Sequence, residues 1–301
     1  MGGKLTIVGL GEALWDVLPG GKVLGGAPLN VACHVHRMLG NRGDGVVASR
    51  VGADTLGDAV LQALATRGMS TEFVQRDAEH ATSTVNVELH DGQPTYVFTP
   101  DIAWDHLEFA PAWAALAARC NAVCFGTLAQ RSRPSRDAIW QFLDAAPQAI
   151  RLFDVNLRQG FFDRESIVEG CRRATIVKLN EHELSVVVES LGLPAVAVDD
   201  QLQALCDTLG LAAVVYTRGQ RGTLLMTIDA TIDVQAVSYP AAADADAVGA
   251  GDACTAGIMV GWLTGSAPEK TAALANHLGA YVASQPGATP ELPVAITAMI
   301  D

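Results

Sequence analysis

The stretch Asp246-Ala-Val-Gly-Ala-Gly-Asp252 runs directly into the small, apolar segment 253–263. Residues 249–251 are small enough for a ligand to approach the backbone closely. They lie where a loop turns into a helix, so their N–H groups and the helix dipole favour an anion there. Asp252 follows at once, and its carboxylate can take a proton from a hydroxyl while the loop amides stabilise a transferring phosphoryl group. The alternative is a glycine-rich helix start with Asp252 as an ordinary first-turn residue.

The composition limits the class of protein around this stretch. The chain has 301 residues, of which 50% are hydrophobic and 18% are charged, as is typical of a globular enzyme. A net charge of −13 speaks against nucleic-acid binding and against docking on anionic membranes. A local group of backbone amides can still bind an anionic cofactor in such a chain.

Targeting and metal signals are weak. No apolar run is long enough to span a bilayer, and residues 1–8 predict a first strand rather than a signal peptide. Cys120 and Cys124 have no second cysteine pair to complete a zinc site. His34, His36 and His277 show no metal-binding spacing either. We therefore expect a cytoplasmic protein with reduced, buried thiols.

Short apolar strands alternate with helical stretches along the chain. Strands are expected at 5–9, 45–49, 122–125, 151–155, 176–179 and 213–217. Helices are expected at 28–39, 56–67, 112–119, 135–145, 181–189, 198–209, 252–263 and 269–283. This alternation predicts an α/β fold of three layers, with a mostly parallel central sheet covered by helices on both faces. Ligands of such a sheet bind beyond the carboxyl ends of the strands.

One region departs from this pattern. Residues 82–89 and 95–99 alternate between apolar and polar types on either side of the turn signal Asp91-Gly92, which predicts a hairpin. A second polar, glycine-rich excursion covers 12–25. We expect a small β lid contributed by about 12–25 and 82–100, inserted into a single domain that spans 1–301.

Candidate hydroxyl-binding groups follow the first expected strand. Asp16 and Asn30 offer a carboxylate and an amide, and the paired glycines Gly25 and Gly26 allow close approach of a ligand. The alternative is a turn followed by a helix cap. The partial dinucleotide fingerprint that begins at Gly9 has no third glycine and no helix after it, so it is rejected.

Further candidates follow later strands. Arg158 can contact a phosphate or a hydroxyl through its planar donors. Asn180 and Glu183 suit a helix capping box, or the binding of Mg²⁺ and its waters, and both interpretations stay open. The turn 217–222 suits the approach of a phosphate, and its alternative is a hairpin into 223–228.

Taken in order, these motifs resemble those of the ribokinase-like (PfkB) carbohydrate kinases, and within that family the fructokinases. The matching segments span nearly the whole chain: Gly11-Glu-Ala-Leu-Trp-Asp-Val-Leu-Pro19, Gly25-Gly-Ala-Pro-Leu-Asn30, Asp154-Val-Asn-Leu-Arg158, Asn180-Glu-His-Glu183, Asp246 to Asp252, and Ser284-Gln-Pro-Gly-Ala-Thr289. One position departs from the family pattern, which usually has Thr where this chain has Ala247.

The resemblance implies a role for each candidate residue. Asp252 would be the base that deprotonates the acceptor hydroxyl, beside an anion hole formed by the amides of Gly249, Ala250 and Gly251. The implied sugar-binding residues are Asp16, Gly25, Gly26, Asn30 and Arg158. The implied nucleotide-binding residues are Asn180, Thr217, Gly219, Gly222 and Asn276. Glu183 would act indirectly on Mg²⁺, and the Asp246 region would hold a monovalent cation such as K⁺, a role that the departure at Ala247 weakens.

The expected function follows from these roles. We expect transfer of the γ-phosphoryl group of ATP to a hydroxyl of a ketohexose, most simply fructose, by a homodimer that associates through its lid. One rival is a kinase of another sugar or a sugar acid such as 2-keto-3-deoxygluconate, for which Arg131 or Arg133 near the lid would suit the carboxylate. Another is a non-catalytic, sugar-sensing relative.

Overall fold

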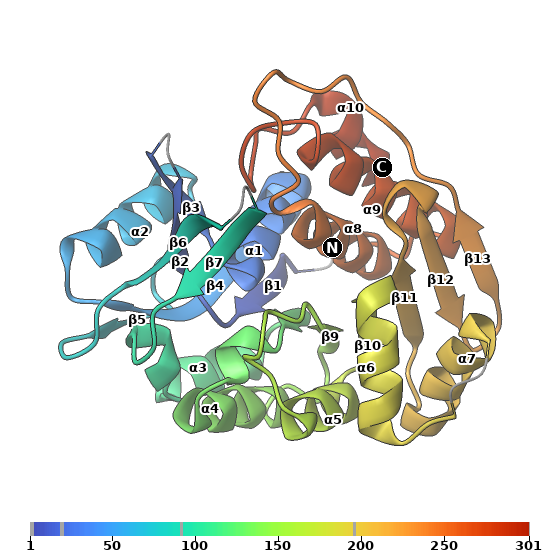
Figure 1. Cartoon of the computed structure of the whole chain (residues 1–301), viewed down its shortest axis with the longest axis horizontal. Coiled ribbons are helices and arrows are strands. Elements are labelled where there is room, and N and C mark those ends of the chain that lie inside the picture. The colour runs from blue at the N-terminus through green and yellow to red at the C-terminus, as the bar shows by residue number, and fades with distance from the viewer. Residues whose placement is uncertain (1–2, 19–20, 91–92, 195–196, 301) are drawn as a thin grey trace.

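A large sheet runs through the computed structural model, which describes residues 3–18, 21–90, 93–194 and 197–300. Its strand order is β13-β12-β11-β10-β9-β8-β1-β4-β5 (Figure 1). Neighbouring strands are parallel from β5 to β11, and β12 and β13 continue the sheet in antiparallel pairing. The strands are β1 (Leu5–Leu10), β4 (Gly43–Gly52), β5 (Val74–Asp77), β8 (Ala122–Phe125), β9 (Ile150–Asp154), β10 (Ile176–Asn180), β11 (Ala213–Thr217), β12 (Thr223–Thr227) and β13 (Thr231–Val234). The predicted, mostly parallel sheet is confirmed.

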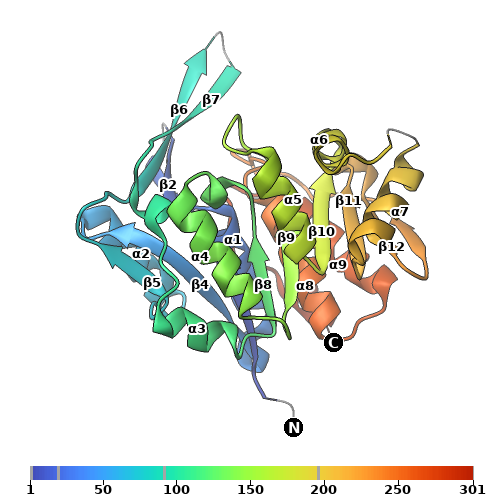
Figure 2. The same cartoon turned by 90° about the horizontal axis from the view of Figure 1, so that it is seen from below.

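Helices cover both faces of this sheet (Figures 1 and 2). One face carries α1 (Ala27–Leu39), α2 (Thr55–Thr66), α8 (Ala250–Leu263), α9 (Pro268–Val282) and the short α10 (Val294–Thr297). The other face carries α3 (Pro111–Ala117), α4 (Arg133–Asp144), α5 (Arg164–Arg173), α6 (Glu181–Leu191) and α7 (Val198–Leu209). Short 3₁₀ turns lie at Gly40–Arg42, Ala103–His106, Leu128–Gln130, Gly219–Arg221 and Ala298–Ile300.

The two covered faces explain why the central strands are mostly apolar. In β1, Ile7 packs on the side of α1 and α8, whereas Val8 and Leu10 pack on the side of α3 and α4. Successive side chains of a strand point to opposite faces, so a sheet buried on both faces needs apolar residues at every position. The predicted three-layer α/β architecture follows.

Several elements carry no strong sequence signal, and α5 and β5 are examples. Helix α5 has charged residues at half of its positions and starts at a capping box between Asp163 and Ser166. Strand β5 contains one apolar residue, Val74, and is held as an edge strand by pairing with β4. Tertiary context stabilises both, which is why the periodicity did not reveal them.

A second, four-stranded sheet has the order β3-β2-β6-β7. It consists of β2 (Leu14–Leu18), β3 (Gly21–Gly25), β6 (Ser83–His90) and β7 (Gln93–Phe98). Strands β6 and β7 pair as an antiparallel hairpin, which projects from the body of the molecule in Figure 2. The predicted turn at Asp91-Gly92 lies outside the described residues.

Two further features of the chain are the state of its cysteines and the hydropathy of its helices. All six cysteines are buried and unpaired: Cys33, Cys120, Cys124, Cys171, Cys206 and Cys254. Among the described residues, no helix combines the length and the hydropathy that crossing a membrane requires.

Candidate active site

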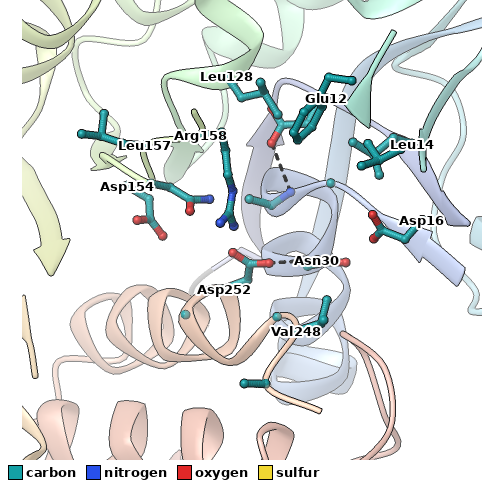
Figure 3. A pocket seen from close by; sticks show the side chains of 18 of the residues that line it. Glu12, Leu14, Asp16, Asn30, Leu128, Asp154, Leu157, Arg158, Val248 and Asp252 are labelled. Carbon is teal, nitrogen blue, oxygen red and sulfur yellow. Dashed lines mark hydrogen bonds between the residues drawn. The ribbon is translucent and has the colours of Figure 1, made fainter. Parts of the chain in front are cut away.

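A cavity of about 590 Å³ lies beside the carboxyl ends of β1, β9 and β10, between the large sheet and the smaller one (Figure 3). Such an edge is where the fold predicts a ligand. Eight of the residues selected from the sequence line it: Asp16, Gly26, Asn30, Arg158, Asp246, Gly249, Gly251 and Asp252.

Asp252 is the third residue of α8, which begins two residues before the predicted start. Gly249 precedes the helix with a φ of 75°, and a Cβ there would come within 2.7 Å of Ala288. Only glycine fits this backbone without strain. The turn therefore directs the buried Asp252 carboxylate into the cavity, where Asn30 Nδ2 donates a hydrogen bond of 2.8 Å to Oδ2.

Burial raises the pKa of Asp252 to about 6, although the hydrogen bond from Asn30 acts in the opposite direction. Removal from water disfavours the charged carboxylate, so the group binds a proton more tightly than an exposed aspartate does. A pKa near 6 leaves the group mostly ionised at neutral pH and makes it a stronger base. These are the properties of a general base.

Two of the three residues of the predicted anion hole line the cavity. Gly249 and Gly251 line the cavity, whereas Ala250 does not, and the Ala250 amide donates to the carbonyl oxygen of Ala247 at 3.3 Å. A Cβ on Gly251 would have Lys178 Nζ, 3.7 Å away, as its nearest neighbour. The open space at Gly251 gives a ligand access to the start of α8.

The paired glycines have separate local tasks. A Cβ on Gly25 would collide with the Asp16 carboxylate, and one on Gly26, where φ is 110°, would collide with the carbonyl oxygen of Glu12. Gly25 thus leaves room for the Asp16 side chain, and Gly26 lets the chain pass closely over the end of β1. Gly25 itself does not line the cavity.

Asp16 and Arg158 both line the cavity; in the view of Figure 3, Arg158 lies just above Asp252 and Asp16 lies to the right of both. Burial raises the pKa of Asp16 to about 6, the positive charge of Arg158 lowers it, and the negative charge of Asp252 raises it. Arg158 therefore lies close enough to both carboxyls for its positive charge to lower their pKa values.

Glu12 belongs to the motif 11–19, but its role in the cavity was not predicted. Its side chain is 4% exposed and lines the cavity. Oε1 accepts the Ala27 amide at 3.2 Å, and Oε2 has no hydrogen-bond partner among the described residues. Burial raises the pKa of Glu12 to about 7. An acidic residue directly after an apolar strand was the available signal.

Lys178 was missed as well. It is a charged residue in the middle of an apolar strand, and its Nζ donates to both oxygens of Asp154 at 3.0 and 2.9 Å. Burial lowers the pKa of Lys178, but the Asp154 carboxylate outweighs it and the net shift is upward. Thr255 of α8 donates to Asp154 at 2.6 Å and ties this ion pair to the helix that carries Asp252.

The smaller sheet contributes apolar surface. Leu14, Val85 and Phe98 line the cavity from β2, β6 and β7. Apolar side chains from a separate sheet, facing carboxylates and an arginine, form a pocket in which polar groups fix the orientation of a ligand.

Asn180 and Glu183 form the capping box that the sequence allowed. Asn180 Oδ1 accepts the amides of His182 and Glu183, and Glu183 Oε2 accepts the amide of Asn180 at 2.9 Å. Glu183 Oε1 accepts the amide of Leu157, a cavity-lining residue, at 3.0 Å. Neither Asn180 nor Glu183 lines the cavity. The observed donors are backbone amides, so a role toward Mg²⁺ stays a prediction and would pass through water.

The remaining nucleotide candidates lie away from the cavity. Thr217 ends β11 beside Asn180, and Gly219 and Gly222 form the turn into β12. The interpretation of 217–222 as a hairpin into the next strand is confirmed. Asn276 accepts a hydrogen bond from Thr223 and donates to two carbonyl oxygens of the β13 region. These contacts fasten α9 to the sheet, and a nucleotide role for Asn276 stays a prediction.

Asp246 fastens the loop before α8. Oδ1 accepts the amide of Val248 at 2.9 Å, and Oδ2 accepts the amide of Gly287 at 3.0 Å. The carboxylate thereby joins the 246–249 loop to the 284–289 segment. Both oxygens serve the backbone, so its role toward a monovalent cation stays a prediction.

Comparison with known proteins places this geometry in a family. Residues 17–295 match the family described as pfkB family carbohydrate kinase. The chain is 30% identical to a fructokinase of Klebsiella pneumoniae, over 97% of each chain, and 29% identical to one of Escherichia coli, over 94% of this chain and 95% of that one.

Solved structures agree with this assignment. The fructokinase of Vibrio cholerae in its fructose, ADP and calcium ion bound form superposes with a TM-score of 0.80, at 25% identity over 99% of each chain. An uncharacterized sugar kinase of Pyrococcus horikoshii superposes with a TM-score of 0.79, at 26% identity over 95% of each chain. The chain belongs to the pfkB family of carbohydrate kinases.

Proposed function

We propose that this sugar kinase is a fructokinase, which transfers the γ-phosphoryl group of ATP to a hydroxyl of a ketohexose, with fructose as the acceptor. The observation that carries the proposal is the buried Asp252 at the start of α8, hydrogen-bonded to Asn30 and sharing a cavity with Asp16 and Arg158. Fructokinases among the curated relatives, at 30% and 29% identity, support the acceptor.

In the proposed reaction, Asp252 accepts the proton of the acceptor hydroxyl as its oxygen bonds to the γ-phosphorus. The bond between that phosphorus and the bridging oxygen of ATP breaks, and ADP leaves with the electron pair. The open start of α8 at Gly249 and Gly251, together with Arg158, would stabilise the transferring group. Asp16, Gly26 and Asn30 would hold the sugar, with Gly25 making room for Asp16.

ATP would approach from the side of β10 and β11, where Asn180, Thr217, Gly219 and Gly222 lie, with Asn276 behind them. Mg²⁺ neutralises phosphate charge when it accompanies ATP, and the site offers the oxygen donors that this hard ion prefers. We place Glu183 in an indirect role, because both its oxygens accept backbone amides. A monovalent cation beside the Asp246 loop belongs to the same proposal.

The charge of the cavity favours a neutral acceptor over a sugar acid. Among the described residues, five carboxyls and two cations line it: Glu12, Asp16, Asp154, Asp246 and Asp252, with Arg158 and Lys178. Lys178 is already paired with Asp154. Arg131 is bound to Asp105 and Arg133 to Asp137, and neither lines the cavity. Arg131, Arg133 and Lys178 are therefore engaged by carboxylates of the protein, and Arg158 is the cavity cation that we assign to the transferring group.

We further propose that the smaller sheet acts as a lid within one kinase domain, and that two copies associate through it. Leu14, Val85 and Phe98 support the lid role because they reach the cavity from three of its strands. Light scattering coupled to size exclusion tests the dimer, and a monomer at all concentrations would contradict it.

An ADP-release assay over a panel of acceptors tests the proposed function. The panel holds fructose, glucose, ribose, a riboside and 2-keto-3-deoxygluconate. We expect the highest kcat/KM with fructose and no release with the acid. A higher kcat/KM with the acid would overturn the fructokinase proposal, and no release with any acceptor would favour a sensing role.

A further inference from the structure

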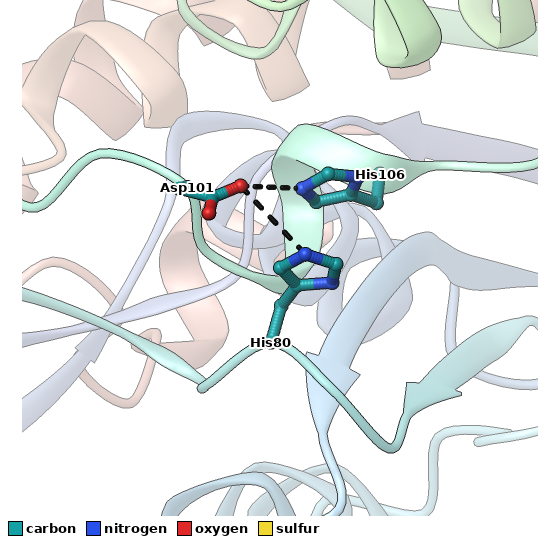
Figure 4. Close-up of side chains that lie close together, drawn as sticks. All are labelled: His80, Asp101 and His106. Atoms are coloured by element: carbon teal, nitrogen blue, oxygen red, sulfur yellow. Dashed lines mark hydrogen bonds and ion pairs between the residues drawn. The ribbon is translucent and has the colours of Figure 1, made fainter.

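A cluster of two histidines and an aspartate lies apart from the catalytic cavity (Figure 4). His106 Nε2 is 2.8 Å and His80 Nε2 is 3.7 Å from Asp101 Oδ1, and the three ligand atoms lie within 4.8 Å of one another. Figure 4 shows both rings presenting a nitrogen to the same carboxylate oxygen. None of the three residues lines the catalytic cavity.

The outer contacts of His80 prepare it as a ligand. Its Nδ1 lies 3.1 Å from Asp77 Oδ2, an atom that also accepts a hydrogen bond from Arg50 Nε at 2.7 Å. Asp77 Oδ1 accepts the amides of Glu79 and His80. A buried carboxylate with these donors is an acceptor, so His80 donates from Nδ1 and keeps a lone pair on Nε2. A carboxylate behind a histidine is the usual outer partner of a metal-bound imidazole.

The distances match the size of a transition-metal site. Bonds of about 2.0–2.1 Å in a tetrahedron separate neighbouring ligand atoms by roughly 3.3 Å. The two measured separations from Asp101, 2.8 and 3.7 Å, lie on either side of this value. Two imidazole nitrogens and one carboxylate oxygen suit Zn²⁺ and its neighbours, whereas Mg²⁺ and Ca²⁺ prefer oxygen ligands throughout.

The chain positions of the ligands give the site a structural consequence. His80 lies shortly before β6, and Asp101 and His106 lie shortly after β7. We propose that His80, Asp101 and His106 bind one divalent transition-metal ion of the Zn²⁺ class, which joins the two ends of the β6–β7 hairpin and leaves one coordination position open. This proposal does not depend on the identity of the sugar.

Binding requires the proton that His106 Nε2 donates to Asp101 Oδ1 at 2.8 Å to move to Nδ1 or to solvent, and it requires one local rearrangement. The His80 and His106 rings are stacked, with centroids 3.6 Å apart and planes 14° apart. An ion lies in the plane of each imidazole that binds it, so the rings have to turn apart about their Cβ–Cγ bonds. Both side chains are partly exposed, 21% for His80 and 30% for His106, so the rings have solvent on one side.

Zinc titration of the full chain, freed of any affinity tag and of metal, tests the site. We expect one Zn²⁺ per chain by calorimetry, with Co²⁺ producing visible d–d absorption at the same stoichiometry. His80→Gln and His106→Gln should each weaken binding at least 100-fold. Asp101→Asn should weaken it about tenfold, and it suits this position because φ is 55°, a conformation that Asn tolerates.

His36→Gln is the matched control, because His36 is also a partly exposed histidine near a carboxylate, Asp44. It should bind zinc like the parent, and excess Mg²⁺ should not compete. Circular dichroism in chelator establishes that the variants are folded. An affinity unchanged in both histidine variants, or no binding by the parent at millimolar zinc, would overturn the proposal.

Hydrogen exchange tests the tie across the hairpin. Zinc should slow exchange of the amides at the hairpin base, residues 82–85 and 97–99, in the parent and not in His106→Gln. Zinc binding that leaves these amides unchanged in the parent would overturn the proposed joining of β6 and β7. Fructose phosphorylation is measured separately, so failure of either proposal leaves the other standing.

Discussion

At the scale of single residues, burial and chemistry act together on Asp252. The residue is 6% exposed, and the loss of water contacts raises its pKa to about 6. The hydrogen bond from Asn30 keeps the charged form accessible. The folded protein thus holds a carboxylate that binds protons more strongly than an exposed aspartate and is still ionised near neutral pH.

Replacement of Asp252, the proposed base, has a sharp expected effect. Asp252→Asn should lower kcat by about 10²–10⁴-fold and leave sugar affinity nearly unchanged, because it removes the proton acceptor and keeps the shape of the side chain. Asp58→Asn is the control, since Asp58 also lies in a helix first turn but is 70% exposed. Steady-state kinetics and sugar titration make the comparison, and near-normal turnover by Asp252→Asn would remove it from the mechanism.

The pH profile should report the same group. Below a pH of about 6, Asp252 carries a proton and cannot accept another, so kcat/KM should fall about tenfold per pH unit and level off above about pH 7. Glu12→Gln keeps this decline at low pH if the titrating group is Asp252, or Asp16 with its similar pKa. A decline that disappears in Glu12→Gln would assign the titration to Glu12 instead.

A second prediction concerns the effect of Glu12 on the free energy of unfolding. Its pKa is about 7 in the folded protein and 4.5 in its unperturbed form, so the folded state binds the proton more tightly. The free energy of unfolding therefore falls as pH rises from about 4.5 to about 7. Glu12→Gln should remove this loss and stabilise the protein at about pH 8 by up to about 3 kcal/mol.

Denaturant unfolding at about pH 5 and about pH 8 measures the effect. The amide oxygen of the introduced glutamine can still accept the Ala27 amide, so the variant and the parent should have similar free energies of unfolding at the lower pH. If Glu12→Gln differs from the parent by the same free energy of unfolding at both pH values, Glu12 is not the group whose titration changes the stability.

At the scale of elements, α8 combines a first turn that lines the cavity with a packed body. Its first turn opens onto the cavity at Gly251, and its later turns are buried between α1 and α9. Gly257 lies where a Cβ would come within 2.7 Å of Ala275 Cα, whereas at Gly251 the nearest atom is 3.7 Å away. The two glycines of one helix therefore serve different purposes.

A matched pair of substitutions separates these purposes. Gly251→Ala should keep or slightly raise the melting temperature, because alanine favours a helix, and should lower kcat/KM because its methyl enters the cavity. Gly257→Ala should lower stability by about 1–3 kcal/mol through overpacking. The melting temperature and kcat/KM of both variants test this difference. A fully active Gly251→Ala would show that the start of α8 does not approach the transferring group.

At the scale of the whole molecule, the cavity is formed by two sheets that come from different parts of the chain. Arg158 lies in the loop after β9 of the large sheet, and Asp252 lies in α8, which packs on that sheet. Val85 and Phe98 come from the projecting hairpin. Because a ligand in this cavity contacts both sheets, its binding should order them relative to one another.

Fructose should therefore stabilise the protein as a whole. At a concentration about 100 times its dissociation constant, the expected gain is about 2.7 kcal/mol, together with slower hydrogen exchange in β6 and β7. Asn30→Ala should lose most of this stabilisation, since Asn30 lines the cavity beside Asp252. Exchange that slows only in α1 and α8 would mean that the hairpin does not close on the sugar.

Much of this molecule could be predicted before its structure was known. Helices with strong periodicity, such as α1, α7 and α9, begin and end within two residues of their predicted bounds. The charged α5 and the edge strand β5 were missed because neighbouring elements stabilise them. At the site, Asp16, Asn30, Arg158 and Asp252 were found as polar residues after strands or at helix starts, and all four line the cavity.

The sequence by itself determined the α/β layering, the loop before α8 and the polar residues at the strand ends. These features depend on the local pattern of apolar residues and on the positions of glycines, so residues close together in the sequence are enough to specify them. Only the tertiary structure decided that Asn30 contacts Asp252, 222 positions away, that Glu12 and Lys178 face the same cavity, and that His80 and His106 share Asp101. Such contacts arise from the packing of distant elements, and burial there sets the pKa values on which the chemistry depends.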